Sequence, residues 1–413
     1  MLISNNSNKT FFFLILYLSL LISFYLGEDS TGGAINDFKM RMTLIENFKS
    51  DFLNTLLNYD KTQDRHSPLI LIIITLLYNL GLEIDFIRLI HLNILPLLIF
   101  FSYKCIKLKF PETNNNILFL ISTVFFISPV MRSLAIWPDS RILGLLFFII
   151  SVFFFLKFKK NKKFNNCLCS NIFLIISSYF SPNFSVFFIF FFYNYLTFYK
   201  VSKKLFLIIT LNFFLALPML YYLFVLDVNF IYNTWAIHNS EIVRFNYANK
   251  ILIISSLIFF YSIPFIINNV FIKFFLKNFK KDYVLKSLFV FIFLTFFFNY
   301  SFDYTGGGIF FKISYLLFNN KYLFLLIAFI SIIFIRLTFK LNLNNIILFF
   351  VLIISNPQLT IYHKYYDTLL LLLYLLLFNF NFDIKKILNK KFLINIYIFY
   401  LIFWGLNLLR YYF

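Results

Sequence analysis

Carboxylates are concentrated in one long polar segment of this chain, residues 27–66. Glu28 and Asp29 directly follow a hydrophobic run, and Asp37 precedes an amphipathic stretch. A carboxylate held beside a substrate hydroxyl can orient that hydroxyl or accept its proton. These three residues are therefore candidates for a catalytic carboxylate.

A second charged group surrounds Asp139, which lies between Arg132 and Arg141 at the boundary of a hydrophobic run. A guanidinium fork matches two phosphate oxygens at once, and a charge at a membrane boundary is costly. The spacing favours a phosphate-binding site at Arg132 and Arg141. Snorkelling arginines that only position helix ends explain the same spacing about equally well.

Two short apolar stretches are too short to span a bilayer comfortably. His66-Ser67-Pro68 opens the first, residues 69–80, which ends at Gly81. We expect this stretch to be a helix embedded in the outer leaflet, with the chain entering the membrane at Phe86. The second stretch ends at Phe318 and follows three glycines, which favour a flexible turn over an anion-binding loop.

A basic and aromatic cluster heads a late leucine run, at residues 356–367. It contains His363 and Lys364, and such a cluster suits the phosphate of a lipid. Ordinary anchoring at the interface explains it about equally well.

The elements that must position these residues are membrane helices. The chain is 61% hydrophobic, 23% aromatic and only 13% charged, so a soluble fold would lack the polar surface to cover itself. The net charge of +20 comes from lysines clustered at the ends of hydrophobic runs, which argues against binding of nucleic acid.

Hydrophobic runs predict an all-α membrane protein with about 13 transmembrane helices and with interfacial and re-entrant helices on the external side. The runs cover residues 11–26, 86–103, 116–131, 140–157, 170–181, 183–199, 205–224, 251–271, 287–300, 322–335, 345–355, 366–380 and 393–409. Alternation places nearly all lysine clusters on one side, as the positive-inside rule predicts for the cytoplasmic face. We therefore expect a cytoplasmic N-terminus, an external active face and a location in the plasma (inner) membrane.

The whole chain, 1–413, is expected to be a single polytopic domain, with 27–85 as its first external loop. Within that loop, apolar residues at three- and four-residue spacing predict an interfacial helix. They are Phe38, Met42, Ile45, Phe48, Phe52 and Leu56. A plain connecting loop is the alternative.

Taken in order, these features resemble the type C membrane glycosyltransferases, particularly the relatives of the protein O-mannosyltransferases and of the lipid A aminoarabinose transferase. That family has an acidic residue, often followed by an aromatic one, early in a large first external loop, and Asp37-Phe38 fits. Glu28 and Asp29 are the alternatives for this acidic position.

The resemblance continues through the first 160 residues. The family shows a His-Pro-Pro-Leu or Lys-Pro-Pro-Leu element before a short embedded helix, then a glycine and an Arg-Leu. The matching residues are His66-Ser67-Pro68-Leu69, Gly81 and Arg88-Leu89, with Ser67 in place of the first proline. Pro129, Arg132 and Pro138-Asp139 look like the family's proline, basic residue and acidic residue at the third span.

The resemblance implies an inverting hexosyl- or pentosyltransferase. Its donor would be a sugar on a polyprenyl phosphate, and its acceptor a lipid, a glycan or a protein on the external side. Asp37 would be the base, and Arg132, Arg141 and Lys364 would bind the phosphate, with His363 beside Lys364. Asp139 and His66 would support the site or a divalent metal, and the need for a metal stays open.

Two other functions compete with this interpretation. A transporter or flippase for a lipid-linked glycan would also be polytopic, but it would place charges near the bilayer midplane and often in repeated halves. The spans here are nearly free of carboxylates, and no repeat is evident. A surface-polysaccharide polymerase would carry its largest external loop late in the chain, whereas here that loop is first.

Overall fold

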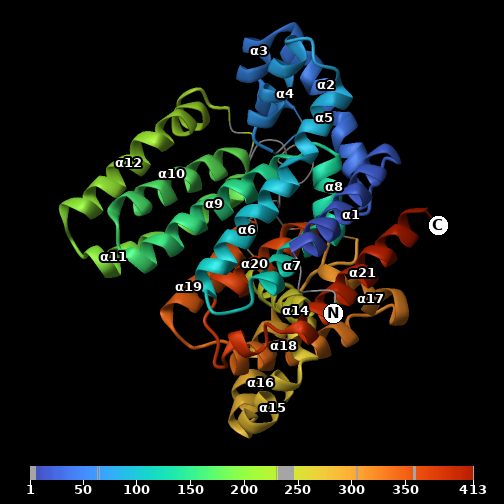
Figure 1. Ribbon diagram of the computed structural model, residues 1–413, viewed down its shortest axis with the longest axis vertical. Helices are drawn as coiled ribbons and strands as arrows, with labels where there is room; N and C mark the ends of the chain where they lie inside the picture. Colours follow the sequence, from blue (N-terminus) through green and yellow to red (C-terminus); the bar gives the residue numbers. More distant parts are fainter. Residues whose placement is uncertain are drawn as a thin grey trace. The chain divides into compact units, whose positions relative to one another are not determined.

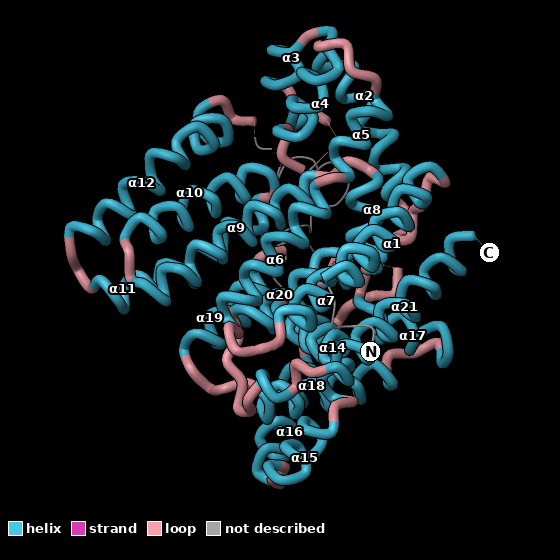
Figure 2. Tube along the Cα trace, in the orientation of Figure 1, coloured by secondary structure: helices cyan, strands magenta, loops and turns pink. Residues whose placement is uncertain are grey.

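Helices account for most of the computed structural model, which describes residues 6–62, 64, 66–228, 230, 246–303, 306–356 and 360–412. Figure 2 shows helices joined by mostly short loops, with no strand drawn. Among these residues, β-type pairing is limited to an isolated antiparallel bridge between Phe339 and Phe380. The prediction of an all-α fold is confirmed.

Within the described part of the chain, five helical segments are long and apolar enough to cross a bilayer, whose hydrocarbon core needs about 20 residues of helix. They are Ile84–Lys109, Ser140–Asn161, Lys203–Val225, Tyr247–Ile266 and Lys390–Arg410. A sixth would be the pair Asn115–Ile127 and Pro129–Ile136, which bends by 64°. The chain therefore has the helices of a multi-pass membrane protein, while the predicted number of about 13 spans is not confirmed.

The described helices fall into two compact units. Unit 1 contains residues 1–242 and 400–413, and unit 2 contains residues 243–399. The boundary lies within the last helix, α21 (Lys390–Tyr412). The expectation of one polytopic domain is not tested by this division, and each unit is described by itself.

Unit 1 is built from helices that follow one another closely along the chain (Figure 1). In order they are α1 (Asn6–Tyr25), α2 (Ala34–Ser50), α3 (Phe52–Leu57), η1 (Tyr59–Lys61), α4 (Leu69–Asn79), α5 (Ile84–Leu92), α6 (Ile94–Lys109), α7 (Asn115–Thr123), η2 (Val124–Ile127), α8 (Pro129–Ile136), α9 (Ser140–Asn161), α10 (Phe164–Phe180), η3 (Pro182–Phe187), α11 (Phe188–Tyr199), α12 (Lys203–Leu220) and the π-helical turn η4 (Tyr221–Val225).

Helix α9 packs between α6 and α10, which run beside it in Figure 1. Gly144 lets the end of α10 approach closely, because a Cβ at that position would lie 2.7 Å from the Cβ of Ser181. Hydroxyl groups join the same helices, as Ser177 donates to the Gly144 carbonyl at 2.7 Å and Ser151 to the Ser170 carbonyl at 2.7 Å. Such small and hydroxyl side chains are typical of close helix packing in membranes.

The amphipathic stretch is helical, but the helix breaks at Asp51, whose side chain caps α3 by accepting from the Asn54 amide. Helix α2 buries Phe38, Ile45 and Phe48 as expected, whereas Phe52 beyond the break is exposed. The buried side of α2 packs against α4, the short apolar helix predicted after Pro68. Their interfacial and membrane-embedded positions stay predictions.

The segment 131–141, expected to be an external turn, is mostly helical. Ser128 accepts a hydrogen bond from the Met131 amide and Pro129 occupies the first turn, so a new helix, α8, starts there. All eight residues of α8 are buried, Arg132 among them.

Unit 2 is arranged around α14 (Tyr247–Ile266), a mostly buried helix that contacts α16, α17, α18 and α19. The other elements of the unit are α15 (Asn269–Asn278), α16 (Lys281–Phe296), α17 (Gly308–Phe318), α18 (Tyr322–Thr338), α19 (Leu343–Ile354), η5 (His363–Tyr365), α20 (Asp367–Leu376), η6 (Ile384–Lys386) and the first part of α21.

The second short apolar helix predicted from the sequence is α17, which starts at Gly308. Gly306 has a φ of 101°, and a Cβ there would meet the Ile361 carbonyl oxygen at 2.5 Å. The amide of Gly307 donates to that same oxygen at 2.9 Å. Glycine is therefore required by a tight backbone contact rather than by an anion. Of the predicted basic and aromatic cluster at 356–367, residues 357–359 lie outside the described residues.

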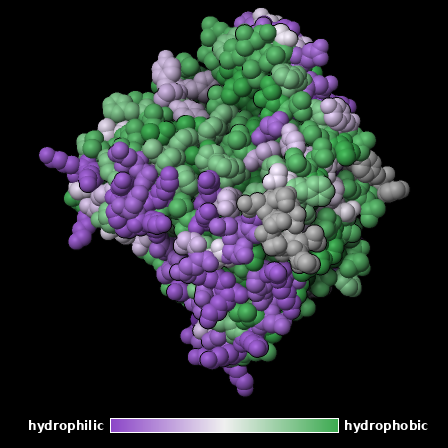
Figure 3. All heavy atoms as spheres, viewed as in Figure 1, coloured by the Kyte–Doolittle hydropathy of each residue, from purple (hydrophilic) through white to green (hydrophobic). Residues whose placement is uncertain are grey.

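Large apolar side chains lie exposed on the surface. Phe206 and Phe224 each expose 69% of their area, and apolar residues, green in Figure 3, cover much of the face shown. Exposed phenylalanines at this density suit a lipid environment rather than water.

Candidate functional site

One buried carboxylate of unit 1, Asp139, lies where α9 begins. Asp139 is the N-cap residue of this apolar helix, and its Oδ1 accepts the Arg141 amide at 2.8 Å. Asp139 is only 3% exposed. A carboxylate is favourable at this position because helix N-termini carry unpaired N–H groups and partial positive charge.

Two arginines donate hydrogen bonds to the Asp139 carboxylate, one from earlier in the chain and one from two residues later. Arg141 donates from Nε to Oδ1 at 2.8 Å and from Nη2 to Oδ2 at 2.7 Å. Arg41 of α2 donates from Nη1 to Oδ2 at 3.0 Å and to the Pro138 carbonyl at 3.0 Å. Burial opposes ionisation of Asp139, but the charges of Arg141 and Arg41 outweigh it and hold its pKa well below the usual range.

The segment between α3 and α4 adds two more polar side chains. Asp64 places Oδ2 at 3.5 Å from Arg41 Nε, and its Oδ1 accepts the His66 amide at 2.9 Å. Burial and the charge of Arg41 lower the pKa of His66 to about 4, so the ring is neutral at pH 7. We call Arg41, Asp64, His66, Asp139 and Arg141 the Asp139 cluster.

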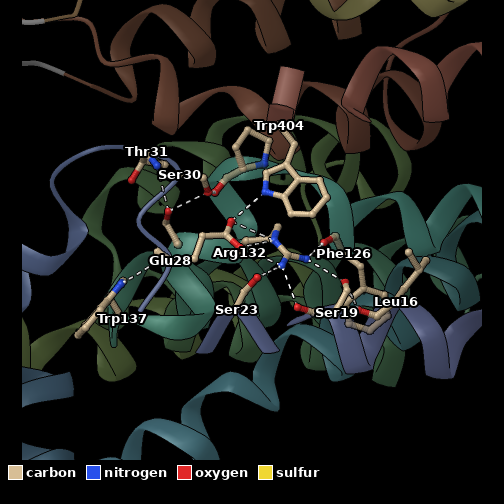
Figure 4. Close-up of polar contacts among 12 residues, drawn as sticks. Leu16, Ser19, Ser23, Glu28, Ser30, Thr31, Phe126, Arg132, Trp137 and Trp404 are labelled. Carbon is tan, nitrogen blue, oxygen red and sulfur yellow. Dashed lines mark hydrogen bonds and ion pairs between the residues drawn. The ribbon is translucent and has the colours of Figure 1, made fainter. Parts of the chain in front are cut away.

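A second buried ion pair joins the end of α1 to α8 (Figure 4). Glu28 is 2% exposed and Arg132 is fully buried. Arg132 Nε lies 3.0 Å from both Glu28 oxygens, and Nη2 donates to Oε2 at 2.9 Å. Burial opposes ionisation of Glu28, and the hydrogen bonds and charge of Arg132 outweigh it and lower its pKa.

Every side-chain nitrogen of Arg132 donates to a protein oxygen. Nη1 reaches the Phe126 carbonyl at 2.8 Å and Ser19 Oγ at 3.3 Å, and Nη2 also donates to Ser23 Oγ and to the Ser19 carbonyl at 3.1 Å. Its guanidinium lies 4.3 Å from the ring centre of Trp404. We call Ser19, Ser23, Glu28, Arg132 and Trp404 the Glu28 cluster.

The other two candidate carboxylates differ in their surroundings. Asp29 is 2% exposed, and its side chain accepts the amides of Gly32, Gly33 and Ile35 at 2.7–3.1 Å. It therefore closes the turn that leads into α2. Asp37 lies in the first turn of α2 and is only partly buried. Of the three candidates for the base, Asp37 is the one that is not fully buried.

His363 and Lys364 belong to unit 2, in the short helix η5. The His363 ring shares a hydrogen bond with the Tyr261 hydroxyl. Burial, with the charge of Lys312 as a smaller cause, lowers the pKa of His363 to about 3. Lys364 Nζ lies 5.3 Å from the ring centre of Tyr362. Their predicted role in phosphate binding stays a prediction.

The Asp139 cluster does not have the donor set of a metal centre. Both Asp139 oxygens accept hydrogen bonds from arginines, and His66 is beside two guanidinium groups. Among the described residues, no group of three or more His, Cys, Asp or Glu side chains could hold a metal ion. We therefore assign no step to a metal.

Arg41 and Asp64 are the members of the cluster that sequence reasoning missed. A signal for Arg41 was present, because it lies three residues after Phe38 and four before Ile45, on the buried side of α2. An arginine within an apolar stripe predicts a buried anionic partner. Asp64 had no such signal, since it lies in an irregular segment among other acidic residues.

No protein-family model, curated protein or solved structure matches this chain. The resemblance to type C glycosyltransferases therefore stays a prediction. Inference of function depends on the chemistry of the residues that unit 1 brings together.

Proposed function

We propose that this chain is a membrane glycosyltransferase that takes a sugar from a polyprenyl-phosphate donor. One observation carries the proposal. The two segments that bear the family-like residues, 28–66 and 129–141, are far apart in sequence, yet they meet around two buried charge clusters in unit 1. Charges buried inside an apolar helical unit are costly, and in membrane proteins they usually serve a function.

In the proposed reaction the acceptor hydroxyl attacks the anomeric carbon and the lipid phosphate leaves. Asp37 accepts the proton of that hydroxyl as the new C–O bond forms. Arg41 and Arg141, aligned by Asp139, stabilise the negative charge that develops on the departing phosphate.

The proposal includes the finer predictions of topology and location. The chain would cross the plasma (inner) membrane about 13 times, with its N-terminus in the cytoplasm and its site on the external side. The acceptor would be a lipid, a glycan or a protein, and the sugar a hexose or a pentose. His363 and Lys364 would contact the lipid phosphate.

The test is a gene deletion complemented by variants, with glycolipids and glycans analysed by mass spectrometry. Deletion should remove one sugar from one product while the lipid-linked donor accumulates. The wild-type chain should restore the product, and Asp37→Asn should lower transfer by roughly two to four orders of magnitude, because it keeps the size but removes the proton acceptor.

The matched control is Asp51→Asn, in the same segment. Asp51 is exposed and caps α3, and asparagine caps a helix about as well as aspartate. It should restore the product fully. Accumulation of a complete lipid-linked glycan on the cytoplasmic side would instead support a flippase. Normal transfer by Asp37→Asn, Glu28→Gln and Asp29→Asn, each present at wild-type levels, would contradict the transferase.

A further inference from the structure

Unit 2 contains a cavity of about 320 Å³ between α14, α16, α18 and α19. Its walls are mostly aliphatic, with Ile254, Ile258, Val290, Ile335 and Ile346 among them. Its volume lies at the lower end of the roughly 300–1,000 Å³ that ligand pockets in proteins occupy. An apolar cavity of this size suits a hydrocarbon chain.

Two buried polar atoms belong to residues that line the same cavity. The Oγ of Ser287, on a residue only 1% exposed, has no hydrogen-bond partner among the described residues. The same holds, within that described part, for the Nε of Arg336. Buried polar groups without a partner are uncommon. A hydroxyl donor and a guanidinium donor in one cavity point to a ligand that carries oxygen acceptors.

Two residues that line this cavity bear positive charge, Arg336 and Lys340. Arg336 lies in the last turn of α18, with its guanidinium 5.7 Å from the ring centre of Tyr283 on α16. Lys340 follows in the turn between α18 and α19, and its side chain is exposed. The cavity therefore combines an apolar interior with two cations.

Two asparagines fix that turn. Asn345 donates to the Lys340 carbonyl at 2.8 Å and to the Asn379 carbonyl at 2.7 Å. Asn381 donates to the Leu337 carbonyl at 2.8 Å and to the Phe339 carbonyl at 3.1 Å. These hydrogen bonds fix the backbone of the turn, so binding of a ligand there costs little backbone entropy.

More basic residues gather at the same end of unit 2. Asn268 donates to the Ile387 carbonyl at 3.5 Å, and Lys391 donates to Asn269 at 3.0 Å, so the segment around η6 meets the start of α15. This end carries Lys273, Lys277, Lys280, Lys281, Lys385, Lys386, Lys390 and Lys391. In Figure 3 hydrophilic residues, in purple, gather over the part that Figure 1 labels α15 and α16. Polybasic segments of this kind attract the anionic lipids of a membrane leaflet.

We propose that this cavity binds one anionic phospholipid of the surrounding bilayer. An acyl chain fills the space between the four helices, and the phosphate lies against Arg336 and Lys340. The Ser287 hydroxyl donates to an ester carbonyl of the same lipid. The site is independent of the proposed transfer reaction, since it needs none of the residues assigned to that reaction.

The test uses the full chain in detergent, titrated with dioleoyl-phosphatidylglycerol or dioleoyl-phosphatidylcholine, with bound lipid counted by native mass spectrometry. The anionic lipid should bind more tightly. Arg336→Gln and Lys340→Gln should each weaken it about fivefold, the effect expected for one cation beside a lipid phosphate. The matched control, Lys277→Gln, removes one exposed charge from α15 and should change binding by less than about twofold.

A second variant tests binding of the acyl chain separately from binding of the lipid headgroup. Ile346 lines the cavity and is 49% exposed, so Ile346→Trp should block the acyl chain without unfolding the protein. It should abolish binding of the anionic lipid while both cations remain. Equal binding of the two lipids, an equal loss with Lys277→Gln, or competition by inorganic phosphate alone would each overturn the proposal. Tighter binding of a polyprenyl monophosphate would also overturn it, since the cavity would then belong to a donor site.

Discussion

The two charge clusters of unit 1 use the same chemical groups in different ways. In the Glu28 cluster one carboxylate meets one guanidinium, and serine, carbonyl and tryptophan groups complete the remaining hydrogen bonds. In the Asp139 cluster two guanidinium groups share one carboxylate, and a second carboxylate and a neutral histidine lie close by. In the Glu28 cluster the ion pair has all its hydrogen bonds within the protein. The Asp139 cluster has more ionisable groups than one ion pair needs.

This difference suggests a structural role for the Glu28 cluster and a role in substrate binding for the Asp139 cluster. A fully hydrogen-bonded pair such as Glu28–Arg132 fixes the end of α1 against α8 and leaves no donor for a substrate. In the Asp139 cluster, Asp64 Oδ2 is buried and accepts no hydrogen bond among the described residues, although Arg41 Nε is 3.5 Å away. A site that exchanges partners with a substrate needs this kind of incomplete pairing.

The largest expected effect is on folding, from Arg132→Met. The methionine keeps an unbranched apolar chain but leaves the Glu28 carboxylate buried without its cation, a change that costs about 3–5 kcal/mol in the free energy of unfolding. Unfolding of the purified protein in detergent, followed by tryptophan fluorescence, measures it.

The control for that change is Arg141→Met, which leaves Arg41 paired with Asp139. It should destabilise the protein less than Arg132→Met does and lower transfer more per molecule folded. The double variant Glu28→Leu with Arg132→Met should recover part of the lost stability, because no buried charge is left alone. Equal unfolding energies for Arg132→Met and Arg141→Met would remove the distinction between the clusters.

Much of this arrangement could be predicted from the sequence. Pro68 and Gly81 bracket α4, and Asp139 caps α9 at the predicted start of a hydrophobic run. Glu28, Arg132, His66, Asp139 and Arg141 were all predicted to be site residues. Arg141 and Asp139 are only two residues apart, so the sequence already groups them. The pairings of Glu28 with Arg132 and of Arg41 with Asp139 were not predicted, because they join residues 104 and 98 positions apart, and the helical period says which side is buried but not which partner it meets.

Helix breaks limited the rest of the prediction. Ser128-Pro129 carries both signals of a helix start, a capping serine and a proline in the first turn, but the run 116–131 is hydrophobic throughout and predicts one uninterrupted span. Arg132 then looks like a residue of a boundary turn, although it lies in the buried helix α8. Burial of the whole of α8 follows from packing against α5 and α9, which the sequence of α8 does not contain.

A pH-dependent effect of smaller size is expected at His66. Its folded pKa is about 4 against about 6.5 when unfolded, so between these values the unfolded chain binds more protons. Stability from the neutral ring is therefore full above pH 6.5 and falls as the pH drops toward 4. His66→Gln should flatten the curve of unfolding temperature over that window while both backbone hydrogen bonds of residue 66 remain. An unchanged slope would show that the ring does not lie beside Arg41.

The smallest expected effect is that of Trp404→Phe, which tests how completely the Glu28 cluster is closed. Trp404 Nε1 donates to Glu28 Oε1 at 2.9 Å, while its ring lies over the Arg132 guanidinium. Phenylalanine keeps a ring there and removes only the donor. Because Glu28 Oε1 still accepts from Arg132 Nε, we expect a loss of about 1 kcal/mol, below the roughly 1.5–3 kcal/mol typical of hydrogen bonds to a charge.

The comparison variant is Trp137→Phe. Trp137 Nε1 donates at 2.9 Å to the backbone carbonyl of Glu28, a neutral acceptor in the same segment. Trp404→Phe should cost at least as much stability as Trp137→Phe and should leave transfer per folded molecule unchanged. A loss of transfer at wild-type stability would place the Glu28 carboxylate in the chemistry, and the two clusters would then have to be regarded as one site.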